Sequence, residues 1–341
     1  MSYDAIVVGA GPAGSVTAKT VAAAGFSVLV LEKNTTCRSP CAGYISRTIN
    51  LELPENCIIQ SKITTMRTYF PDLSFHDFQL DGFVVDRPSF DTALVMKAKE
   101  SGAEFKWDSP LSNLIPGGVE FRGGKASGKV IVGADGVFSK TATLLGMERQ
   151  KVAVCAQYHV KGIRLLSETG EIFFDNNYAP GGYVWVYPTG EDSAKIGLGL
   201  TKGNPREYLD AFIGDRIADR FAGRKKEYIT GALPVAGLRE KLVFNNVLLA
   251  GDSAGMADPI TGAGINNAVL SGEIAGRTII EALENDDVAV LLNYETRIRR
   301  LLGKPLARAL EKRKRLDACV NNELLQEHLP EFWVTFKQYW A

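Results

Sequence analysis

The first thirty-three residues read as a strand, a helix and a second strand. Residues 3–8 form a short apolar run, residues 15–24 are rich in alanine, and a second apolar run covers 27–31. Short uninterrupted apolar runs are typical of strands buried in a parallel sheet, and alanine favours helix. The pattern therefore predicts a β-α-β unit at the start of the chain.

Three glycines, Gly9, Gly11 and Gly14, lie where the first predicted strand turns into the helix. In a dinucleotide-binding unit the first glycine permits the tight turn, the second lets the backbone approach a pyrophosphate, and the third lets the helix pack on the sheet. The N–H groups at the helix N-terminus bind phosphate. Glu32 closes the second strand, where a carboxylate accepts hydrogen bonds from ribose hydroxyls. We expect a bound dinucleotide here, and a purely structural glycine turn is the alternative.

A second strand-and-helix pattern lies late in the chain, over residues 246–265. An apolar strand ends in Gly-Asp, a loop of proline and glycine follows, and an apolar helical stretch continues to about residue 283. Asp252 at the strand end is placed to bind a ribityl hydroxyl. The N-terminus of the helix, near Gly264 and Ile265, suits the N1–C2=O edge of a flavin, which becomes negative on reduction.

These motifs, together with Asp135 and Gly136 at the end of an apolar run from residue 130, resemble those of the FAD-dependent p-hydroxybenzoate hydroxylase superfamily. Members of that superfamily carry an N-terminal fingerprint, a middle Asp-Gly motif and a late Gly-Asp motif in this order. The resemblance spans residues 3 to about 285. It implies that the cofactor is FAD and not NAD.

Three local strings resemble the geranylgeranyl reductase family, which includes archaeal digeranylgeranylglycerophospholipid reductases. They are Cys-Arg-Ser-Pro-Cys-Ala-Gly-Tyr-Ile-Ser at 37–46, Ala-Pro-Gly-Gly-Tyr-Val-Trp-Val-Tyr-Pro at 179–188 and Asp-Pro-Ile-Thr-Gly-Ala-Gly-Ile at 258–265. In that family the first two flank the flavin and a long prenyl cavity. The resemblance implies FAD contacts from the matching residues, which are Ala13, Glu32, Cys41, Ala42, Tyr44, Arg87, Asp252, Gly264 and Ile265, with Leu111 as a backbone contact to the adenine. The chain departs from the family in Tyr187, where Phe is usual, in Tyr44, where Gly is common, and in its shorter C-terminal region.

The resemblance implies a reductase that saturates isolated C=C bonds of a prenyl chain. Hydride from the flavin N5 would reach one alkene carbon and a proton the other, which requires positioning and a dry cavity. Cys41, Tyr44 and an ordered water are the candidate proton donors. Tyr183 and Trp185 alternate along a strand and so share one face, where they line the substrate cavity or pack in the core. The reductant is an external donor (NAD(P)H, ferredoxin or another), because we find no second nucleotide fingerprint.

Two other activities remain open at this point. The string from Tyr183 to Pro188 partly matches the WxWxIP string of flavin halogenases, so an oxygenase or halogenase of the same fold is one alternative. A flavoprotein that passes electrons to a quinone or a partner protein is the other. Its iron–sulfur form is disfavoured because Cys57, Cys155 and Cys319 are isolated. We expect no metal site, since the pair Cys37 and Cys41 has no further Cys or His nearby.

The predicted fold class is α/β, with a Rossmann-type FAD-binding domain and an α+β substrate domain. Residues 1–60, 82–150 and 240–285 are assigned to a discontinuous FAD-binding domain that includes a helix over 88–101 and a hairpin over 118–132. Residues 61–81 and 151–239 alternate apolar and polar positions, as strands of a half-buried antiparallel sheet do. A helix over 204–222 interrupts that sheet, and residues 286–341 form a short helical C-terminal region.

Composition and charge exclude several classes of protein. The 39 basic residues equal the 39 acidic ones, so no global field holds nucleic acid. No run of about eighteen apolar residues exists, and the predicted strand near Tyr3 leaves no room for a signal peptide. Five cysteines make no disulfide framework, so we expect a reducing, cytoplasmic setting. The basic amphipathic stretch over 291–315 and the aromatic tail suit either an anionic membrane surface or a solvated helix packed on its own core.

Overall fold

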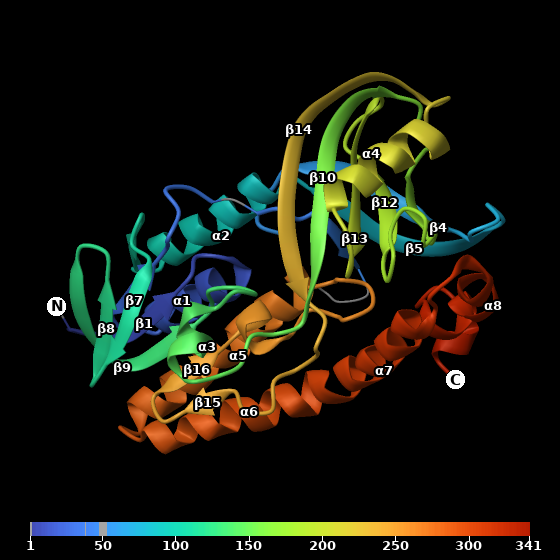
Figure 1. The fold of residues 1–341 in the computed structure, drawn as a ribbon. Helices are drawn as coiled ribbons and strands as arrows, with labels where there is room; N and C mark the ends of the chain where they lie inside the picture. Colours follow the sequence, from blue (N-terminus) through green and yellow to red (C-terminus); the bar gives the residue numbers. More distant parts are fainter. Residues whose placement is uncertain (1, 38, 48–52) are drawn as a thin grey trace.

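Two eight-stranded sheets dominate the computed structural model, which describes residues 2–37, 39–47 and 53–341 (Figure 1). The first sheet has the order β15-β16-β9-β1-β2-β6, and the hairpin partners β7 and β8 extend from β9. The strands are β1 (Ser2–Val8), β2 (Val28–Leu31), β6 (Glu104–Lys106), β7 (Leu111–Ile115), β8 (Gly118–Phe121), β9 (Gly124–Gly133), β15 (Val243–Phe244) and β16 (Val247–Leu249). Strands β6, β2, β1, β9 and β16 run parallel, as the buried apolar runs predict.

Three helices pack together beside the first sheet: α1 (Pro12–Ala23), α2 (Arg87–Glu100) and α5 (Ile265–Glu284). Helices α1 and α5 approach closely because α5 presents glycines to α1. A Cβ on Gly272 would lie 2.5 Å from the Ala13 carbonyl oxygen, and one on Gly276 would lie 2.5 Å from Thr20 Cβ. The observed α2 agrees with the helix expected over 88–101, and Asp86 caps it by accepting a hydrogen bond from Ser89 N.

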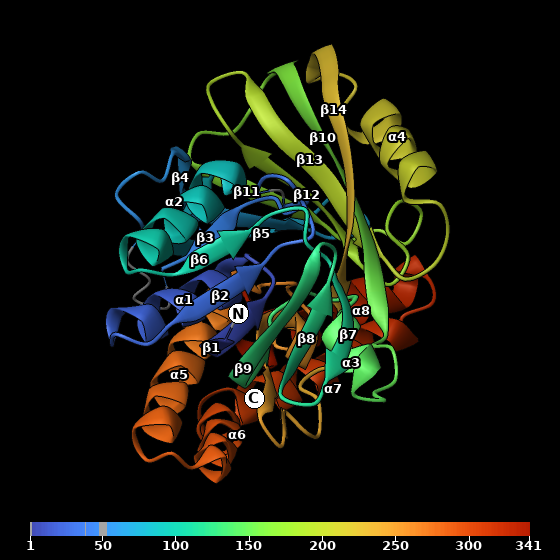
Figure 2. The ribbon, with the colours of Figure 1, turned by 90° about the vertical axis from the view of Figure 1, so that its left-hand side faces the viewer.

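The second sheet, with the order β14-β10-β13-β12-β11-β4-β5-β3, lies above the first in the view of Figure 2. Neighbouring strands are antiparallel except β4 and β11. The strands are β3 (Tyr44–Ser46), β4 (Ile59–Tyr69), β5 (Phe75–Val85), β10 (Val152–Ile163), β11 (Thr169–Phe173), β12 (Tyr183–Pro188), β13 (Ser193–Leu200) and β14 (Phe221–Pro234). Pairing with β5 thus places residues 44–46 in this sheet as well.

Helix α4 (Pro205–Arg216) covers the outer face of the second sheet (Figure 2). Its Leu209, Phe212 and Ile213 belong to the same apolar cluster as side chains of β10, β12 and β13. The helix was expected over 204–222 but ends at Arg216. The reason is that β14 begins at Phe221 and pairs with β10, so sheet hydrogen bonds replace helical ones.

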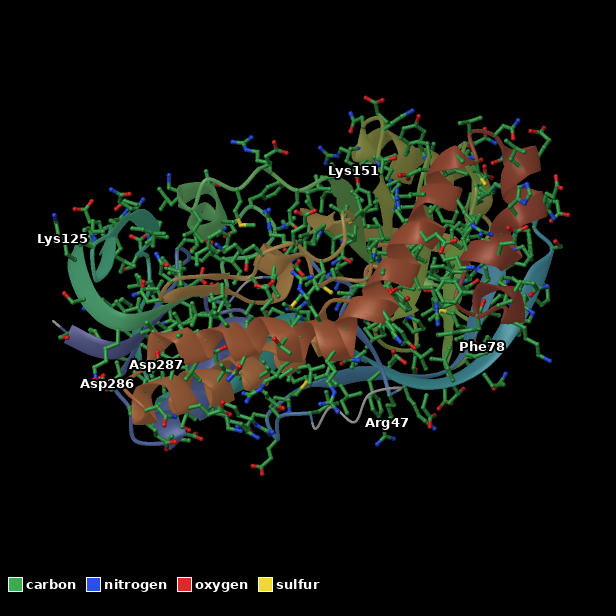
Figure 3. The ribbon with its side chains drawn as sticks, turned by 90° about the horizontal axis from the view of Figure 1, so that it is seen from below. Arg47, Phe78, Lys125, Lys151, Asp286 and Asp287 are labelled. Atoms are coloured by element: carbon green, nitrogen blue, oxygen red, sulfur yellow. The ribbon has the colours of Figure 1, made fainter. Side chains whose placement is uncertain are left out.

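The C-terminal region runs along the underside of the molecule, from the end near Asp286 and Asp287 to the second sheet (Figure 3). It contains α6 (Leu292–Ile298), a π-helical turn over 299–303, α7 (Lys304–Ala318) and α8 (Asn322–Phe332). Tyr294 is fully buried and donates a hydrogen bond to the Leu249 carbonyl of the first sheet. No helix within the described ranges is long and apolar enough to cross a membrane.

Four arginines of this region form ion pairs within the fold. Arg297 pairs with Glu281, Arg299 with Glu295, and Arg315 with Glu311 and Glu331. Arg313 is buried, pairs with Asp317 and donates to the Gly181 carbonyl. The apolar positions of the stretch, Tyr294, Ile298, Leu302 and Leu306, belong to the core of the first sheet, so its apolar face is packed on its own core.

The aromatic tail also packs inward. Trp333 is 4% exposed, contacts Phe174 and Tyr183, and donates from Nε1 to Thr68 Oγ1 at 3.0 Å, whereas Trp340 is 61% exposed. The tail thus anchors the C-terminal helices to the second sheet.

We predict that Trp333→Ala lowers the free energy of unfolding by about 3–5 kcal/mol, since it empties a buried aromatic site and removes the indole N–H that bonds Thr68 Oγ1. Trp340→Ala is the matched control and should cost below about 1 kcal/mol. Urea unfolding measures both. Equal effects of the two substitutions would contradict the anchoring role of Trp333.

Candidate functional site

The glycine turn between β1 and α1 has the geometry of a phosphate cradle. Gly9 has φ +103°, and a Cβ there would lie 2.3 Å from the Ala134 carbonyl oxygen. A Cβ on Gly14 would lie 1.9 Å from the Gly9 oxygen, so only glycine lets α1 pack this closely. Gly11 is the N-cap of α1 and faces open space, since a Cβ there would meet no atom within 4 Å. The free N–H groups of α1 therefore point to a site that a pyrophosphate fits.

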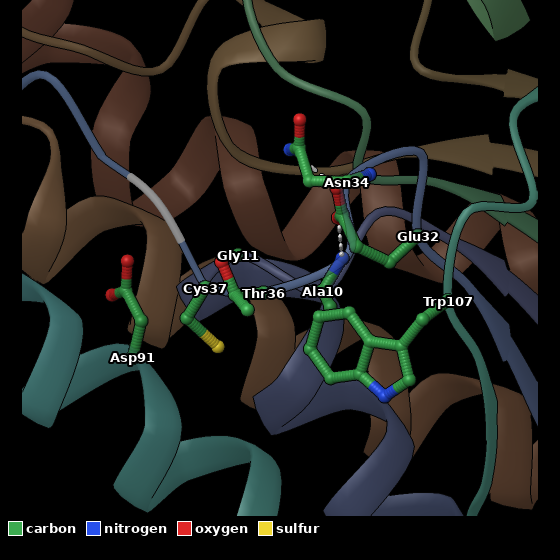
Figure 4. Close-up of a pocket in the computed structure, with 8 residues that line it drawn as sticks. All are labelled: Ala10, Gly11, Glu32, Asn34, Thr36, Cys37, Asp91 and Trp107. Atoms are coloured by element: carbon green, nitrogen blue, oxygen red, sulfur yellow. Dashed lines mark hydrogen bonds between the residues drawn. The ribbon is translucent and has the colours of Figure 1, made fainter.

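Glu32 stands beside this turn, in a pocket shown in Figure 4. Its Oε2 accepts a hydrogen bond from Ala10 N at 2.9 Å, and its Oε1 accepts from the backbone and side chain of Asn34. The pocket is lined by Ala10, Gly11, Glu32, Asn34, Thr36, Cys37, Asp91 and Trp107. A carboxylate fixed next to a phosphate cradle, with an indole at one side, fits the adenosine half of a dinucleotide.

The loop of Cys41, Ala42 and Gly43 is clamped to the end of β5. Gly43 has φ +85°, and a Cβ there would lie 2.3 Å from the Val85 oxygen. The Gly43 carbonyl accepts from Val85 N at 2.9 Å, and Cys41 Sγ accepts from Gly43 N at 3.3 Å. Lys195 of β13 donates from Nζ to the carbonyls of Ala42 (2.9 Å) and Val85 (3.2 Å).

Lys195 is a functional candidate that the sequence analysis missed. It is only 3% exposed, and burial lowers the pKa of its ammonium. The sequence of the 193–200 strand could have indicated it. Side chains alternate between the two faces of a strand, so Lys195 shares a face with Gly197 and Gly199. A lysine among glycines on a buried face is unusual unless the ammonium is hydrogen-bonded.

Arg87 and Asp91 form a buried ion pair in the first turns of α2. Arg87 is 7% exposed and Asp91 4%, and two Arg87 nitrogens bond the Asp91 carboxylate at 3.0–3.3 Å. Burial raises the pKa of the Asp91 carboxyl, and the Arg87 guanidinium opposes that rise. Arg87 also interacts with the Cys41 thiol, so it lies at the loop where a flavin contact is expected.

Asp252 and the N-terminus of α5 meet at the end of β16. A Cβ on Gly264, the N-cap of α5, would lie 3.4 Å from Asp252 Oδ1. Among the residues that the structure describes, none donates a hydrogen bond to the Asp252 carboxylate, and burial raises its pKa. Gly251 packs on Ala13, so this corner adjoins the phosphate cradle. An unpaired carboxylate beside the free N–H groups of Ile265 and the following turn fits a polyol and a carbonyl edge.

Three aromatic side chains of β12, Tyr183, Trp185 and Tyr187, lie at alternate positions of the strand and so share one face of the second sheet. Tyr187 stacks on Tyr44 with ring centroids 5.1 Å apart. Tyr183 donates to the Thr261 carbonyl at 2.6 Å, and the Trp185 ring lies over Gly197. These rings belong to one apolar cluster with side chains of β4, β11 and the C-terminal helices.

The remaining expected residues lie farther along the first sheet. Leu111 is buried at the start of β7. Asp135 accepts hydrogen bonds from Ser139 Oγ, Thr141 N and Thr141 Oγ1, which holds the start of α3 (Lys140–Leu144). Gly136 has φ +79° and open space around it. In this arrangement the Asp135 carboxylate orders the loop after β9.

A phosphate cradle on a parallel sheet, joined to an antiparallel sheet whose aromatic face covers a clamped loop, defines an oxidoreductase of the flavin-dependent fold. Comparison with solved structures agrees. The crystal structure of a geranylgeranyl bacteriochlorophyll reductase-like protein from Thermoplasma acidophilum superposes with a TM-score of 0.89 at 26% identity, covering 100% of this chain and 94% of that one. A flavin-dependent brominase gives 0.71 at 19% identity, covering 97% and 99%, which shows the fold alone.

The chain belongs to the geranylgeranyl reductase family. The family model of the geranylgeranyl reductase catalytic domain matches residues 151–233, and that of an NAD(P)-binding Rossmann-like domain matches 7–68. Digeranylgeranylglycerophospholipid reductase of Methanocella arvoryzae is 36% identical, over 89% of this chain and 84% of the relative. Reductase 2 of the same name from Methanothermobacter thermautotrophicus is 34% identical, over 95% and 90%. The family favours reduction over the oxygenase, halogenase and electron-carrier alternatives.

We predict that Arg87→Met lowers the free energy of unfolding by about 3–5 kcal/mol, because it strands the buried Asp91 carboxylate. The double variant Arg87→Met, Asp91→Leu should recover most of that loss, since no unpaired charge remains buried. Arg122→Met, which breaks the exposed pair with Asp108, is the control and should cost about 0–1 kcal/mol. A double variant as unstable as the single one in urea unfolding would show that the pair's charge is not the cause.

Proposed function

We propose that the cofactor of this reductase is FAD and that its substrate is a phospholipid carrying geranylgeranyl chains. The relatives described above are named digeranylgeranylglycerophospholipid reductases, which supports this substrate class. The observation that carries the proposal is the aromatic face of β12 laid against the clamped loop of Cys41, Ala42 and Gly43.

The residues present fit FAD along its whole length. The Gly9 to Gly14 turn would hold the pyrophosphate and Glu32 the adenosine ribose. Asp252 would accept from the ribityl chain, and the N-terminus of α5 would face the N1–C2=O edge. Reduced FAD would supply the hydride that an alkene needs.

Burial and shape, rather than charge, would hold the prenyl chain. An isolated alkene offers no carbonyl to polarise, so the protein contributes position and exclusion of water. Buried Trp185 and half-buried Tyr183 present aromatic surface, and each buried CH₂ of a lipid chain contributes about 0.8 kcal/mol. Recognition of this kind depends on the length and shape of the prenyl chain and not on its functional groups. It therefore suits a substrate with several equivalent double bonds.

The proton for the second alkene carbon comes from this chain in our proposal. Cys41 and Tyr44 are the candidate donors, and both lie at the clamped loop. Burial raises the pKa of Tyr44 to about 12, so its phenol stays protonated and gives up its proton poorly. Cys41 Sγ accepts a hydrogen bond from Gly43 N, and Lys195 Nζ donates to the carbonyl of the next residue, Ala42, so the thiol lies among hydrogen-bond donors. We therefore assign the donor role to Cys41.

The lipid substrate also places the protein at a membrane in our proposal, within the cytoplasm and with an external electron donor. Exposed Trp340 and the exposed basic residues Lys304, Arg308 and Lys314 of α7 are the surface we assign to that contact. Arg308 lies over the Trp340 ring at 5.4 Å, so charge and aromatic surface are joined there.

We predict that Asp252→Ala weakens FAD binding about 10- to 100-fold, because the ribityl chain loses a charged acceptor. Glu284→Ala, at the exposed far end of α5, should leave FAD affinity unchanged. Flavin absorbance after gel filtration measures retention in both. Full FAD retention by Asp252→Ala would contradict the site.

We also predict that the dithionite-reduced holoenzyme is reoxidised by a geranylgeranyl phospholipid without oxygen. The product should be heavier by two hydrogen atoms for each bond reduced, as read by mass spectrometry. A saturated-chain phospholipid is the control and should leave the flavin reduced. If only oxygen or a quinone reoxidises the flavin, the assigned substrate is wrong.

A further inference from the structure

Three ionisable side chains form a row across the second sheet, from its interior to solvent. They are Lys195 on β13, His159 on β10 and Glu227 on β14. In the sheet register His159 is directly opposite both Lys195 and Glu227, which places neighbouring Cβ atoms about 5 Å apart. Exposure rises along the row: Lys195 is 3% exposed, while the side chains of His159 and Glu227 are 36% and 59% exposed.

Lys195, at the inner end of the row, has one N–H group that is not used in a hydrogen bond with the described residues. An ammonium carries three N–H groups, and Lys195 donates two of them to the carbonyls of Ala42 and Val85. Within the described part of the chain the third has no acceptor. Ala42 is bonded directly to Cys41, so this third N–H lies beside the loop that carries the assigned proton donor.

The middle of the row can accept and release protons at either ring nitrogen. His159 Nδ1 lies 3.6 Å from Glu227 Oε2, and His159 Nε2 lies 3.5 Å from Gln157 Nε2. Gln157 is buried, and its Oε1 has no hydrogen-bond partner among the described residues. Turning the Gln157 amide over exchanges its nitrogen and oxygen, so that Oε1 would accept from a protonated His159. The buried amide thus accommodates both protonation states of the imidazole.

We propose that Glu227, His159 and Lys195 form a path that carries protons from solvent to Cys41 for alkene reduction. This inference rests on the proposed function. In each turnover one alkene carbon takes a hydride from the reduced cofactor and the other takes a proton from the Cys41 thiol. The thiolate regains a proton from the Lys195 ammonium. Because both ring nitrogens of His159 face other partners, the resulting amine regains its proton from His159 through a bridging water in our proposal. His159 is then reprotonated by solvent at Glu227. The net uptake is one hydride and one solvent proton per bond.

The charges around the row suit this task. Burial and Arg87 lower the pKa of Lys195, while Cys41 and Asp86 raise it, and the net direction is downward. Burial and Lys195 lower the pKa of His159, while Glu227 and Asp86 raise it, and the net direction is again downward. Both groups therefore release a proton more readily than in water.

The electrostatic coupling in the row is tested first, without turnover. The protein has three histidines, so the C2–H signals of His159 can be assigned by NMR and titrated in the FAD-loaded enzyme. Lys195→Met should raise the His159 midpoint, because it removes the cation that disfavours imidazolium, and Lys195→Arg should restore it. Lys161→Met removes an exposed lysine of β10 outside the row and should change nothing. A His159 midpoint that stays the same in Lys195→Met overturns the coupling.

Proton delivery is tested next, by anaerobic reoxidation of reduced holoenzyme with a geranylgeranyl phospholipid across pH. Lys195→Arg keeps the positive charge and donors to the Ala42 and Val85 carbonyls, but arginine does not deprotonate in proteins. It should retain FAD and slow reoxidation about 100-fold. Lys195→Ala should be slowed similarly and partly rescued by added methylamine, and His159→Gln should lose rate most at high pH, where solvent protons are scarce.

Rates of Lys195→Arg and His159→Gln that follow the wild-type pH profile would overturn the path, even if Lys195→Ala fails to fold. A wild-type enzyme that the lipid does not reoxidise would instead refute the proposed function, and the His159 titration would still report on the coupling. The two failures are therefore distinguishable.

Discussion

The arrangement of the site depends on one buried ammonium. Lys195 extends from β13 to the carbonyls of Ala42 and Val85, and so joins the clamped loop and the end of β5 to the middle of the second sheet. Burying a charge is expensive unless hydrogen bonds compensate it. The same two carbonyls would lose this donor if the lysine moved. The strand, the loop and the start of α2, which follows Val85 closely, are therefore held in one geometry.

The C-terminal helices support that geometry from the other side. Tyr294 donates a hydrogen bond to the first sheet and Trp333 donates one to the second, so the helices from α6 to α8 together span both sheets. Lys151, which directly precedes β10, adds an ion pair with Asp317 of α7 at 2.8 Å. A protein whose two sheets contribute to one site needs such a brace, because a shift between the sheets would separate the groups that must react.

Local features of this fold were predictable from sequence, and long-range ones were not. The glycine turn, Glu32 at the end of β2, the helix that begins near Pro88 and the hairpin around Gly123 depend on neighbours in sequence. Lys195 and Ala42 are 153 positions apart, so no local pattern predicts their contact. The expected helix over 204–222 shows the competing effect, since pairing of β14 with β10 overrides helix propensity beyond Arg216. The basic C-terminal pattern likewise did not reveal that Glu281, Glu295 and Glu331 would pair with three of its arginines.

The face of the second sheet that lies toward the clamped loop contains buried polar atoms that lower the stability of the fold. Trp185, Gly197 and Gln157 are aligned across three strands, and both Trp185 Nε1 and Gln157 Oε1 are buried without a partner among the described residues. Each such orphaned polar atom costs about 1–3 kcal/mol, and apolar side chains at these positions would avoid that cost. Gly197 gives up packing as well, since its missing side chain makes room for the Trp185 ring. Local rules of stability are broken at functional sites, and this row adjoins Lys195, His159 and the aromatic face of β12. The unpaired atoms therefore lie on the same face as the proton path proposed above.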